Sequence, residues 1–243
     1  MKYAVISDIH GNLEALMAVL KDIKKRRADV IVCLGDIVGY YPDPCRCIEL
    51  VTAHCTYCVA GNHDFAAVGM TNTNSFTYYA LAAIEWTKER LTEYDKEFLS
   101  FLPMTFQFED ILFTHASPAD PPKFSYVFPD NEDSIFNAFK NMNCRINFIG
   151  HTHWPFMLVK EGEEIALSQG STIELNEESS YLINVGSVGQ PRDYDNRSCY
   201  ALYDTKKRTI TLRRVKYNYK ITQKKIRENN LPVFLAERLE KGR

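Results

Sequence analysis

The sequence predicts an α/β fold built on a mixed β-sheet, and two patterns lead to this prediction. In the first 70 of the 243 residues, short apolar strands alternate with helical segments, a spacing typical of parallel strands joined by right-handed crossovers. Beyond Pro103, apolar segments follow one another at hairpin spacing, which predicts antiparallel strands in the same sheet. No repeat, low-complexity tract or flexible linker divides the chain, so we expect a single domain over residues 1–243.

The elements of the first 70 residues follow from the spacing of apolar side chains. Strands are expected at residues 3–6, 30–34 and 57–60. Apolar residues from Leu13 to Ile23 recur at helical spacing after Asn12, a residue suited to cap the N-terminus of a helix. That helix is expected to end in the basic run 24–27, because positive charges in the last turn complement the helix dipole. A second helix is expected at residues 45–54.

The rest of the chain divides into a helical segment, a run of strands and a helical end. Residues 74–102 carry an aromatic stripe at helical spacing, which we expect to face the core, with a lid over a site as the alternative. Further strands are expected at residues 105–108, 111–114, 146–149, 156–160, 164–167, 180–184, 199–204 and 208–215. Two short helical segments, broken at Leu231-Pro232, are expected in the basic C-terminal region, residues 206–243.

The composition excludes several classes of protein. With 45% hydrophobic residues the chain can bury a full core, so it is not a disordered protein. The net charge of −2 gives no overall attraction to nucleic acid or to a membrane surface. No run of 18 apolar residues predicts a transmembrane helix and no signal-peptide core is found, so we expect a cytoplasmic protein with no membrane partner. The seven cysteines are then expected as reduced thiols.

Strand after strand of the predicted sheet ends in a side chain that can bind a metal ion. The segments read Ile6-Ser7-Asp8-Ile9-His10, Leu34-Gly35-Asp36, Ala60-Gly61-Asn62-His63-Asp64, Phe113-Thr114-His115 and Ile149-Gly150-His151-Thr152-His153. Because the carboxyl ends of strands in an open α/β sheet gather at one edge, we expect these side chains to converge. Residues two apart project from one face of an extended backbone, so Asp8 and His10, like His151 and His153, could bind the same cluster.

The converging side chains offer carboxylate, amide and imidazole ligands and no thiolate. The seven candidate metal ligands are Asp8, His10, Asp36, Asn62, His115, His151 and His153. Such a set suits Mn, Fe, Zn, Co or Ni. Seven ligands are too many for one ion but suit two ions that share a carboxylate. Each fragment alone is a weak signal, and the prediction rests on their joint occurrence, each after an apolar strand.

These motifs, in this order, resemble those of the calcineurin-like metallophosphoesterase superfamily. The matching residues are Asp8-x-His10, Gly35-Asp36-x-x-Gly39, Gly61-Asn62-His63-Asp64, His115 and Gly150-His151-x-His153. Residues 184–192, Asn-Val-Gly-Ser-Val-Gly-Gln-Pro-Arg, also resemble the small prokaryotic phosphodiesterase branch of that superfamily. The resemblance implies a four-layer α/β/β/α sandwich of two mixed β-sheets.

The resemblance also implies roles for the individual residues. One metal would be held by Asp8, His10, Asp36 and His153, and a second by Asp36, Asn62, His115 and His151. Asp36 would bridge the two ions, and a metal-bridging hydroxide would attack phosphorus in line. His63 would be the general acid that protonates the leaving alkoxide, and Asp64 would hold the His63 ring in orientation through a hydrogen bond or would be an exposed turn carboxylate.

Two departures narrow the subfamily that this chain resembles. Diadenosine tetraphosphatases and serine/threonine protein phosphatases carry Gly-Asp-x-x-Asp-Arg-Gly, whereas residues 35–40 here read Gly-Asp-Ile-Val-Gly-Tyr. The arginine that grips phosphate in that motif is missing, which disfavours protein phosphatase activity and weakens the case for cleavage of symmetrical dinucleotides. Ala116 follows His115 where many relatives have glycine.

Arg192, Asn62 and Tyr40 are candidate substrate-binding residues. Arg192 follows a glycine-rich loop and could bind a substrate phosphate or form a surface salt bridge. Tyr40 and Tyr41 could stack on a base or line the mouth of the site, or they could pack against Pro42 or Pro44.

Four cysteines fall in pairs that superficially suggest a zinc site, Cys45-x-Cys47 and Cys55-x-x-Cys58. Cys45 and Cys47 point to different sides of a helix, and Cys58 lies in an apolar strand. Thiols that pack as small apolar groups are the favoured interpretation.

The residues and the resemblance together predict a metal-dependent phosphodiesterase or phosphatase whose substrate is a small or nucleotide-derived phosphate ester. One alternative is a nuclease, because residues 206–227 hold ten basic residues and no acidic one, interleaved with Tyr217 and Tyr219. A second alternative is a non-catalytic scaffold that binds a protein partner. Such scaffolds usually lose metal ligands or the acid histidine, and this chain keeps both. The sequence leaves open the substrate, the metal and whether the chain forms a homo-oligomer.

Overall fold

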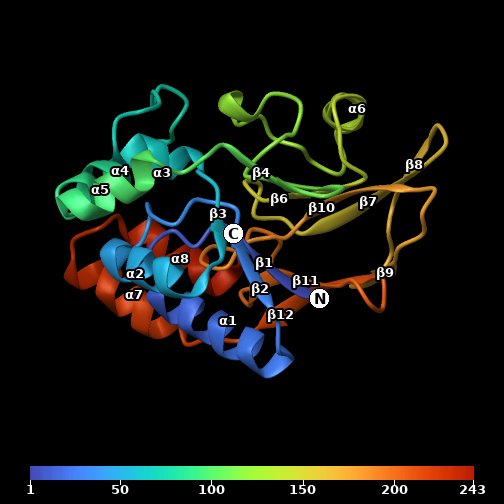
Figure 1. Ribbon diagram of the computed structural model, residues 1–243. Coiled ribbons are helices and arrows are strands. Elements are labelled where there is room, and N and C mark those ends of the chain that lie inside the picture. The colour runs from blue at the N-terminus through green and yellow to red at the C-terminus, as the bar shows by residue number, and fades with distance from the viewer.

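Two six-stranded sheets face each other in the computed structural model, which describes residues 1–243 (Figure 1). The first sheet has the strand order β3-β2-β1-β11-β12-β9. Its strands are β1 (Lys2–Ile6), β2 (Val30–Cys33), β3 (Tyr57–Cys58), β9 (Thr172–Glu174), β11 (Ser198–Asp204) and β12 (Thr209–Val215). Strands β1, β2 and β3 are parallel, and β11, β12 and β9 add to them in antiparallel pairs, so the sheet is mixed as expected.

The second sheet has the order β4-β5-β6-β10-β7-β8 and is mixed in the same way. Its strands are β4 (Thr105–Phe108), β5 (Ile111–Thr114), β6 (Ile146–Ile149), β7 (Phe156–Glu161), β8 (Glu164–Leu167) and β10 (Ser180–Asn184). Strands β5, β6 and β10 are parallel, whereas β4, β7 and β8 join through antiparallel pairs. The parallel strands of both sheets place their carboxyl ends where the sheets meet, and this arrangement positions the site described below.

Apolar side chains from both sheets fill the space between them. Tyr3 and Val5 of β1 pack in one buried cluster with Phe113 of β5 and Phe148 of β6. The Tyr3 and Phe113 rings lie 6.4 Å apart across the interface. Alternate residues of these strands face outward, so each sheet also offers a second apolar face that helices must cover.

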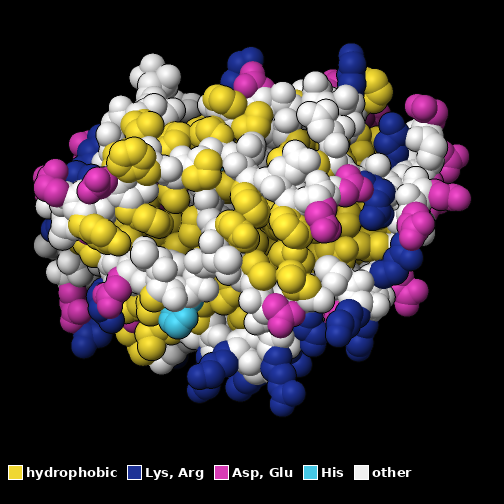
Figure 2. Space-filling model, viewed as in Figure 1, with side chains coloured by type: hydrophobic (Ala, Val, Ile, Leu, Met, Phe, Trp, Pro, Cys, Tyr) yellow, Lys and Arg dark blue, Asp and Glu magenta, His cyan; other side chains and the backbone are white.

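Helices cover the outer faces and complete a four-layer sandwich (Figure 1). Helix α1 (Leu13–Arg26) and α2 (Pro44–His54) pack on the outer face of the first sheet, and α6 (Glu132–Lys140) packs on the outer face of the second. Asn12 caps α1 by accepting a hydrogen bond from the Ala15 amide, as the sequence predicts. The basic run at residues 24–27 lies at the carboxyl end of α1. Figure 2 shows basic side chains along the lower edge of the molecule.

Two further groups of helices lie at one end of the sandwich. Helices α3 (Asn62–Ala67), α4 (Tyr78–Lys88) and α5 (Glu93–Ser100) follow β3, and α7 (Tyr219–Glu228) and α8 (Val233–Lys241) follow the last strand. The apolar faces of α7 and α8 pack with Ala80 and Ala83 of α4 and with Tyr40 and Tyr41. The two C-terminal helices therefore support the loop that follows β2.

The structure corrects several sequence-based boundaries. Residues 74–102 form two helices rather than one segment, because the Thr92 side chain caps a new helix and Asp95 accepts the Thr92 amide in return. The expected strand at residues 57–60 is shorter, since β3 ends at Cys58. Five strands, β4, β5, β6, β8 and β10, have the expected bounds. Helices α3 and α6 and strand β9 were not predicted. None of the helices has the length and apolar character needed to span a bilayer.

Candidate metal centre

The predicted metal-type ligands converge where the two sheets meet. Asp8 and His10 follow β1 and Asp36 follows β2 of the first sheet. His115 follows β5, and His151 and His153 follow β6 of the second sheet. Asn62 is the first residue of α3. All of these side chains except Asn62, which is partly exposed, are buried. The ligands thus converge as expected, but they come from strand ends of two sheets rather than from one edge of a single sheet.

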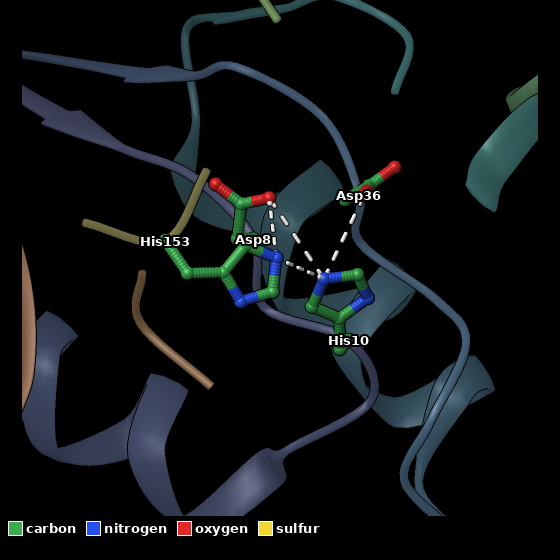
Figure 3. Close-up of side chains that lie close together, drawn as sticks. All are labelled: Asp8, His10, Asp36 and His153. Carbon is green, nitrogen blue, oxygen red and sulfur yellow. Dashed lines mark hydrogen bonds and ion pairs between the residues drawn. The ribbon is translucent and has the colours of Figure 1, made fainter. Parts of the chain in front are cut away.

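One group of ligand atoms comes from Asp8, His10, Asp36 and His153, whose atoms all lie within 4.8 Å of one another (Figure 3). His10 Nε2 lies 3.1 Å from His153 Nε2 and 3.6 Å from Asp36 Oδ2. His153 Nε2 lies 3.2 Å from Asp8 Oδ1. Two imidazole nitrogens and two carboxylates therefore point toward one common point.

A second group of ligand atoms comes from Asp36, His115 and His151. His115 Nε2 lies 3.4 Å from Asp36 Oδ2, 3.1 Å from His151 Nδ1 and 3.2 Å from Asn62 Oδ1. The Asp36 oxygen that faces His10 also faces His115, so Asp36 stands between the two groups.

Backbone carbonyls fix the tautomer of three histidines in these groups. His10 Nδ1 donates to the Val38 carbonyl at 3.1 Å, His115 Nδ1 to the Leu34 carbonyl at 2.9 Å and His153 Nδ1 to the Gln190 carbonyl at 2.6 Å. Because a carbonyl only accepts, Nδ1 carries the proton, and in the neutral ring Nε2 turns its lone pair toward the group.

The donor set fits divalent cations. The Nε2 lone pairs of His10 and His153 face each other at 3.1 Å, and Asp8 Oδ1 is buried without a hydrogen-bond partner. Buried acceptors that face acceptors are costly unless a cation lies among them. Nitrogen and oxygen ligands without thiolate suit Mn, Fe, Zn, Co or Ni.

Most of the candidate ligands already have the protonation state that metal binding requires. Burial alone would raise the pKa of the Asp8 and Asp36 carboxyls, but the neighbouring His153 and His115 respectively lower both pKa values well below the usual range. Burial lowers the pKa of His151 to about 3 and also lowers those of His10 and His153. At neutral pH these side chains are therefore carboxylates and neutral imidazoles, the forms that bind metal.

His115 differs from the other histidines in its protonation. Burial disfavours its imidazolium, but the Asp36 carboxylate outweighs burial and raises the pKa of His115 to about 9. A cation at this position would take the place of the His115 proton.

The backbone at the ligands is left-handed, which corrects the expected extended geometry. Asp8 and His10 have φ of 56° and 54°, Asp36 has 51°, and His151 and His153 have 67° and 60°. Asp8 and His10 do converge on one group, but through these turns rather than through alternation along a strand, whereas His153 joins the first group and His151 the second. A side chain other than glycine in this region costs about 1–3 kcal/mol, and such strain clusters at functional sites.

Two glycines let the strand ends approach one another. A Cβ atom on Gly61 would lie 2.1 Å from Asp36 Oδ1, and one on Gly150 would lie 2.6 Å from Asp8 Oδ2. The segment 184–192 completes the support: the Gly189 amide and the Ser187 hydroxyl donate to the Asp8 carbonyl. The segment that resembles the phosphodiesterase branch therefore contacts the backbone of the candidate ligand Asp8.

Asp64 has a different role from the expected one. Its carboxylate is buried and accepts hydrogen bonds from the backbone amides of Ile37 (2.8 Å), Val38 (3.2 Å) and Gly61 (3.0 Å). It makes no hydrogen bond to His63, whose Nδ1 is buried without a partner. Asp64 is therefore neither an exposed turn residue nor the orienting partner of His63, and it joins the loops that carry Asp36 and Asn62.

A cavity of about 490 Å³ opens beside the ligand groups. The predicted residues Tyr40, Asn62, His63, His151 and Arg192 line it. Further residues that were not predicted to line the cavity do so, among them Phe76, Phe124 and Tyr126. Phe76 was expected in a helix facing the core, but it lies before α4 and its ring is 4.7 Å from that of His63.

Tyr126 stacks on His151 with ring centroids 4.0 Å apart and an interplanar angle of 18°. Tyr126 lies in a loop with no periodic spacing of apolar residues, so nothing in a single sequence predicts that it lines the cavity.

The cysteines form no metal site. All seven are free thiols, and the two groups above are the only sets of three or more histidine, cysteine or acidic side chains with ligand atoms this close. Burial raises the pKa of the Cys47 and Cys199 thiols, as expected for cysteines that pack as apolar groups.

A sequence profile described as the calcineurin-like phosphoesterase superfamily domain matches residues 1–208. The chain belongs to this superfamily. A metallophosphoesterase from Sphaerobacter thermophilus is 34% identical, with a TM-score of 0.86 over 100% of this chain and 99% of its own. This phosphoesterase is therefore a metal-dependent phosphoric ester hydrolase with the two-sheet fold of its superfamily.

Two relatives of this phosphoesterase bear no functional name. An uncharacterized protein from Methanocaldococcus jannaschii is 43% identical over 244 residues, which cover 99% of this chain and 98% of the relative. A hypothetical protein from Pyrococcus horikoshii is 20% identical with a TM-score of 0.78, over 100% of this chain and 98% of its own, a likeness in fold.

Proposed function

We propose that this phosphoesterase holds two divalent metal ions that share Asp36 and hydrolyses a small or nucleotide-derived phosphodiester or phosphomonoester. The observation that carries the proposal is that two ligand groups meet at the Asp36 carboxylate and adjoin one cavity. The first group comprises Asp8, His10, Asp36 and His153, and the second comprises Asp36, Asn62, His115 and His151. Divalent ions there supply a nucleophilic water at neutral pH and neutralise charge on the phosphoryl oxygens.

His63 is the proposed general acid. Its imidazole lines the cavity next to Asn62, and its ring centroid lies 4.8 Å from that of His10. It is not a member of either ligand group. A side chain in this position can carry a proton to the leaving oxygen without giving up a metal bond.

Arg192 and Tyr40 are proposed to hold the substrate. The Arg192 guanidinium donates to Gln190 Oε1 from Nε (3.1 Å) and Nη2 (2.7 Å) and to the Tyr40 hydroxyl at 3.3 Å. No carboxylate lies within 4.0 Å of it, so the salt bridge that was the alternative in the sequence is absent. Its charge is free to meet a phosphate in the cavity.

The cavity favours a small substrate over nucleic acid. A volume of about 490 Å³ suits a ligand of nucleotide size. In the basic strip 206–227, Arg208, Arg213, Arg214, Lys224 and Lys225 each pair with a carboxylate. Tyr217 and Tyr219 pack against buried clusters rather than lying free to stack on bases. These contacts weaken the case for a nuclease.

Metal-free protein reconstituted in turn with Mn, Fe, Zn, Co and Ni tests the proposal. The substrates to compare are an aryl phosphomonoester, an aryl phosphodiester, a 2′,3′-cyclic nucleotide and a dinucleoside polyphosphate. We expect hydrolysis of a small ester that requires the added ion. Activity confined to oligonucleotides and lost steeply with salt would favour the nuclease instead. No hydrolysis with any ion would contradict the proposal.

The variant His63→Asn is expected to keep its metal content and to lose turnover in a way that depends on the leaving group. For an alkyl ester, whose leaving oxygen needs a proton, kcat should fall about a hundredfold or more. For an aryl ester with a good leaving group the loss should be much smaller. Steady-state kinetics over a series of leaving groups measures this difference.

The matched control is His54→Asn, which replaces an exposed histidine outside the site. It should leave kcat unchanged for every ester. Equal losses of His63→Asn across the whole leaving-group series would remove His63 from the role of general acid.

A further inference from the structure

Arg238 of α8 and Arg192 both lie close to the ring of Tyr40. Arg238 lies outside residues 1–208, the segment that matches the superfamily. The Arg238 guanidinium carbon is 5.9 Å from the centroid of the Tyr40 ring, and that of Arg192 is 5.8 Å from the same centroid. Tyr40 lines the cavity, and its ring centroid is 4.6 Å from that of His10. Two guanidinium groups therefore flank one ring at the edge of the metal centre.

The fold holds Arg238 in this position firmly. Leu235, Ala236 and Leu239 of α8 are buried against Tyr40 and Tyr41, so Arg238 leaves the helix at the border of its buried face. Helix α7 is fastened in turn, because Lys225 pairs with Glu14 at 2.6 Å and with Asp43 at 2.8 Å. Ordering a long side chain at a fixed place lowers the entropic cost of using it to bind a ligand.

Neither guanidinium forms a salt bridge with an aspartate or a glutamate. No Asp or Glu carboxylate lies within 4.0 Å of Arg192 or Arg238, whereas the neighbouring Arg197 and Arg214 each pair with an aspartate. Arg238 Nε donates to an oxygen of Arg243, the last residue of the chain, and both Nη atoms of Arg238 have no protein partner. Burial and, after it, the positive charge of Arg192 lower the pKa of Arg238. Two like charges held close together in a half-buried place favour an anion that can contact both.

We propose that Arg238 and Arg192 form a subsite for a second phosphate group of the substrate, remote from the phosphoryl group that is hydrolysed. Both guanidiniums lie at the Tyr40 ring, whose centroid is 4.6 Å from that of His10, and neither belongs to a ligand group, so we place the second phosphate beside the metal centre rather than in it. Guanidinium groups suit phosphate because their planar donors match its oxygens. The proposal rests on the proposed function of the cavity and narrows its substrate class to esters that carry a second phosphate.

Kinetics with two nucleotides that differ only in the remote phosphate test the subsite. Adenosine 3′,5′-bisphosphate and adenosine 3′-monophosphate offer the same 3′-ester, and only the first has a 5′-phosphate. In the metal-loaded wild-type enzyme, kcat/KM should favour the bisphosphate. In Arg238→Gln that preference should fall about tenfold, mainly through KM, because a charge-assisted contact is lost. Arg238→Lys, which keeps the charge but not the planar fork, should lie between the two.

Lys241→Gln is the matched control, since it removes one exposed positive charge from the same helix. It should leave the preference as in the wild type. An Arg238→Gln variant that loses activity equally on both nucleotides, or on neither, would overturn the subsite and leave Arg238 as a packing residue over Tyr40.

A binding measurement separates failure of the subsite from failure of the proposed function. In calorimetric titrations of the metal-free protein, the bisphosphate should bind about tenfold more tightly than the monophosphate, and Arg238→Gln should remove the difference. This result would uphold the subsite even if neither nucleotide were hydrolysed. Equal binding of the two nucleotides to the wild type would overturn the subsite even if the enzyme hydrolysed other esters, and this test also serves if Arg238→Gln fails to fold.

Discussion

Replacing Asp36 with asparagine is expected to prevent the binding of both metal ions and to lower turnover about a thousandfold, which corresponds to about 4 kcal/mol of transition-state stabilisation. Asp36 Oδ2 faces His10 at 3.6 Å and His115 at 3.4 Å, so its loss removes a ligand from each group. Asp36 Oδ1 accepts the His63 amide at 2.8 Å, and an asparagine oxygen can keep that bond. The fold should therefore survive while the ions are lost.

Elemental analysis and steady-state kinetics on the same preparation measure the effect of Asp36→Asn. The control is Asp133→Asn, which makes the same chemical change at an exposed position of α6, on the far side of the second sheet. Asp133→Asn should keep the ion content and the turnover of the wild type. Two ions per chain in purified Asp36→Asn would show that Asp36 is not shared.

Metal removal is expected to lower the thermal stability of the protein by about 10 °C or more. In the metal-free chain, buried lone pairs of His10 and His153 face each other, and Asp8 Oδ1 has no hydrogen-bond partner. A cation present at about a thousand times its Kd stabilises the fold by about 4 kcal/mol per site. For a chain of this length, each kcal/mol raises Tm by about 2–4 °C. Calorimetry of the chelated and the reloaded protein measures the difference.

The same measurement on Asp36→Asn serves as the control for metal removal. Its Tm should respond little to added ions, because both sites are lost together. A wild-type Tm that stays constant on addition of Mn, Fe, Zn, Co and Ni would contradict metal binding by these residues.

The ligands of the site could be predicted from the sequence because their signal is local. Asp8, Asp36, His115 and His151 each lie shortly after an apolar strand, and the carboxyl ends of parallel strands have to meet. The strands themselves are marked by runs of apolar residues. The assignment of Asp36 to both groups came from the resemblance to the superfamily, and the distances around its Oδ2 atom agree with it.

The rest of the site depends on contacts that no local pattern records. The rings of His10 and His153 are oriented by hydrogen bonds to the carbonyls of Val38 and Gln190, which are distant in the chain. The Asp64 carboxylate accepts hydrogen bonds from the amides of Ile37 and Val38, which are 27 and 26 residues away in the chain. The sequence around Asp64 therefore does not predict that this carboxylate is buried. Arg238 reaches the site only because α8 packs against Tyr40.

Anomalous diffraction from crystals of the manganese-loaded protein tests the central claim most directly. We expect two manganese peaks per chain, one in contact with Asp8, His10 and His153 and the other with Asn62, His115 and His151, and both in contact with Asp36. A single peak, or two peaks of which only one contacts Asp36, would contradict it.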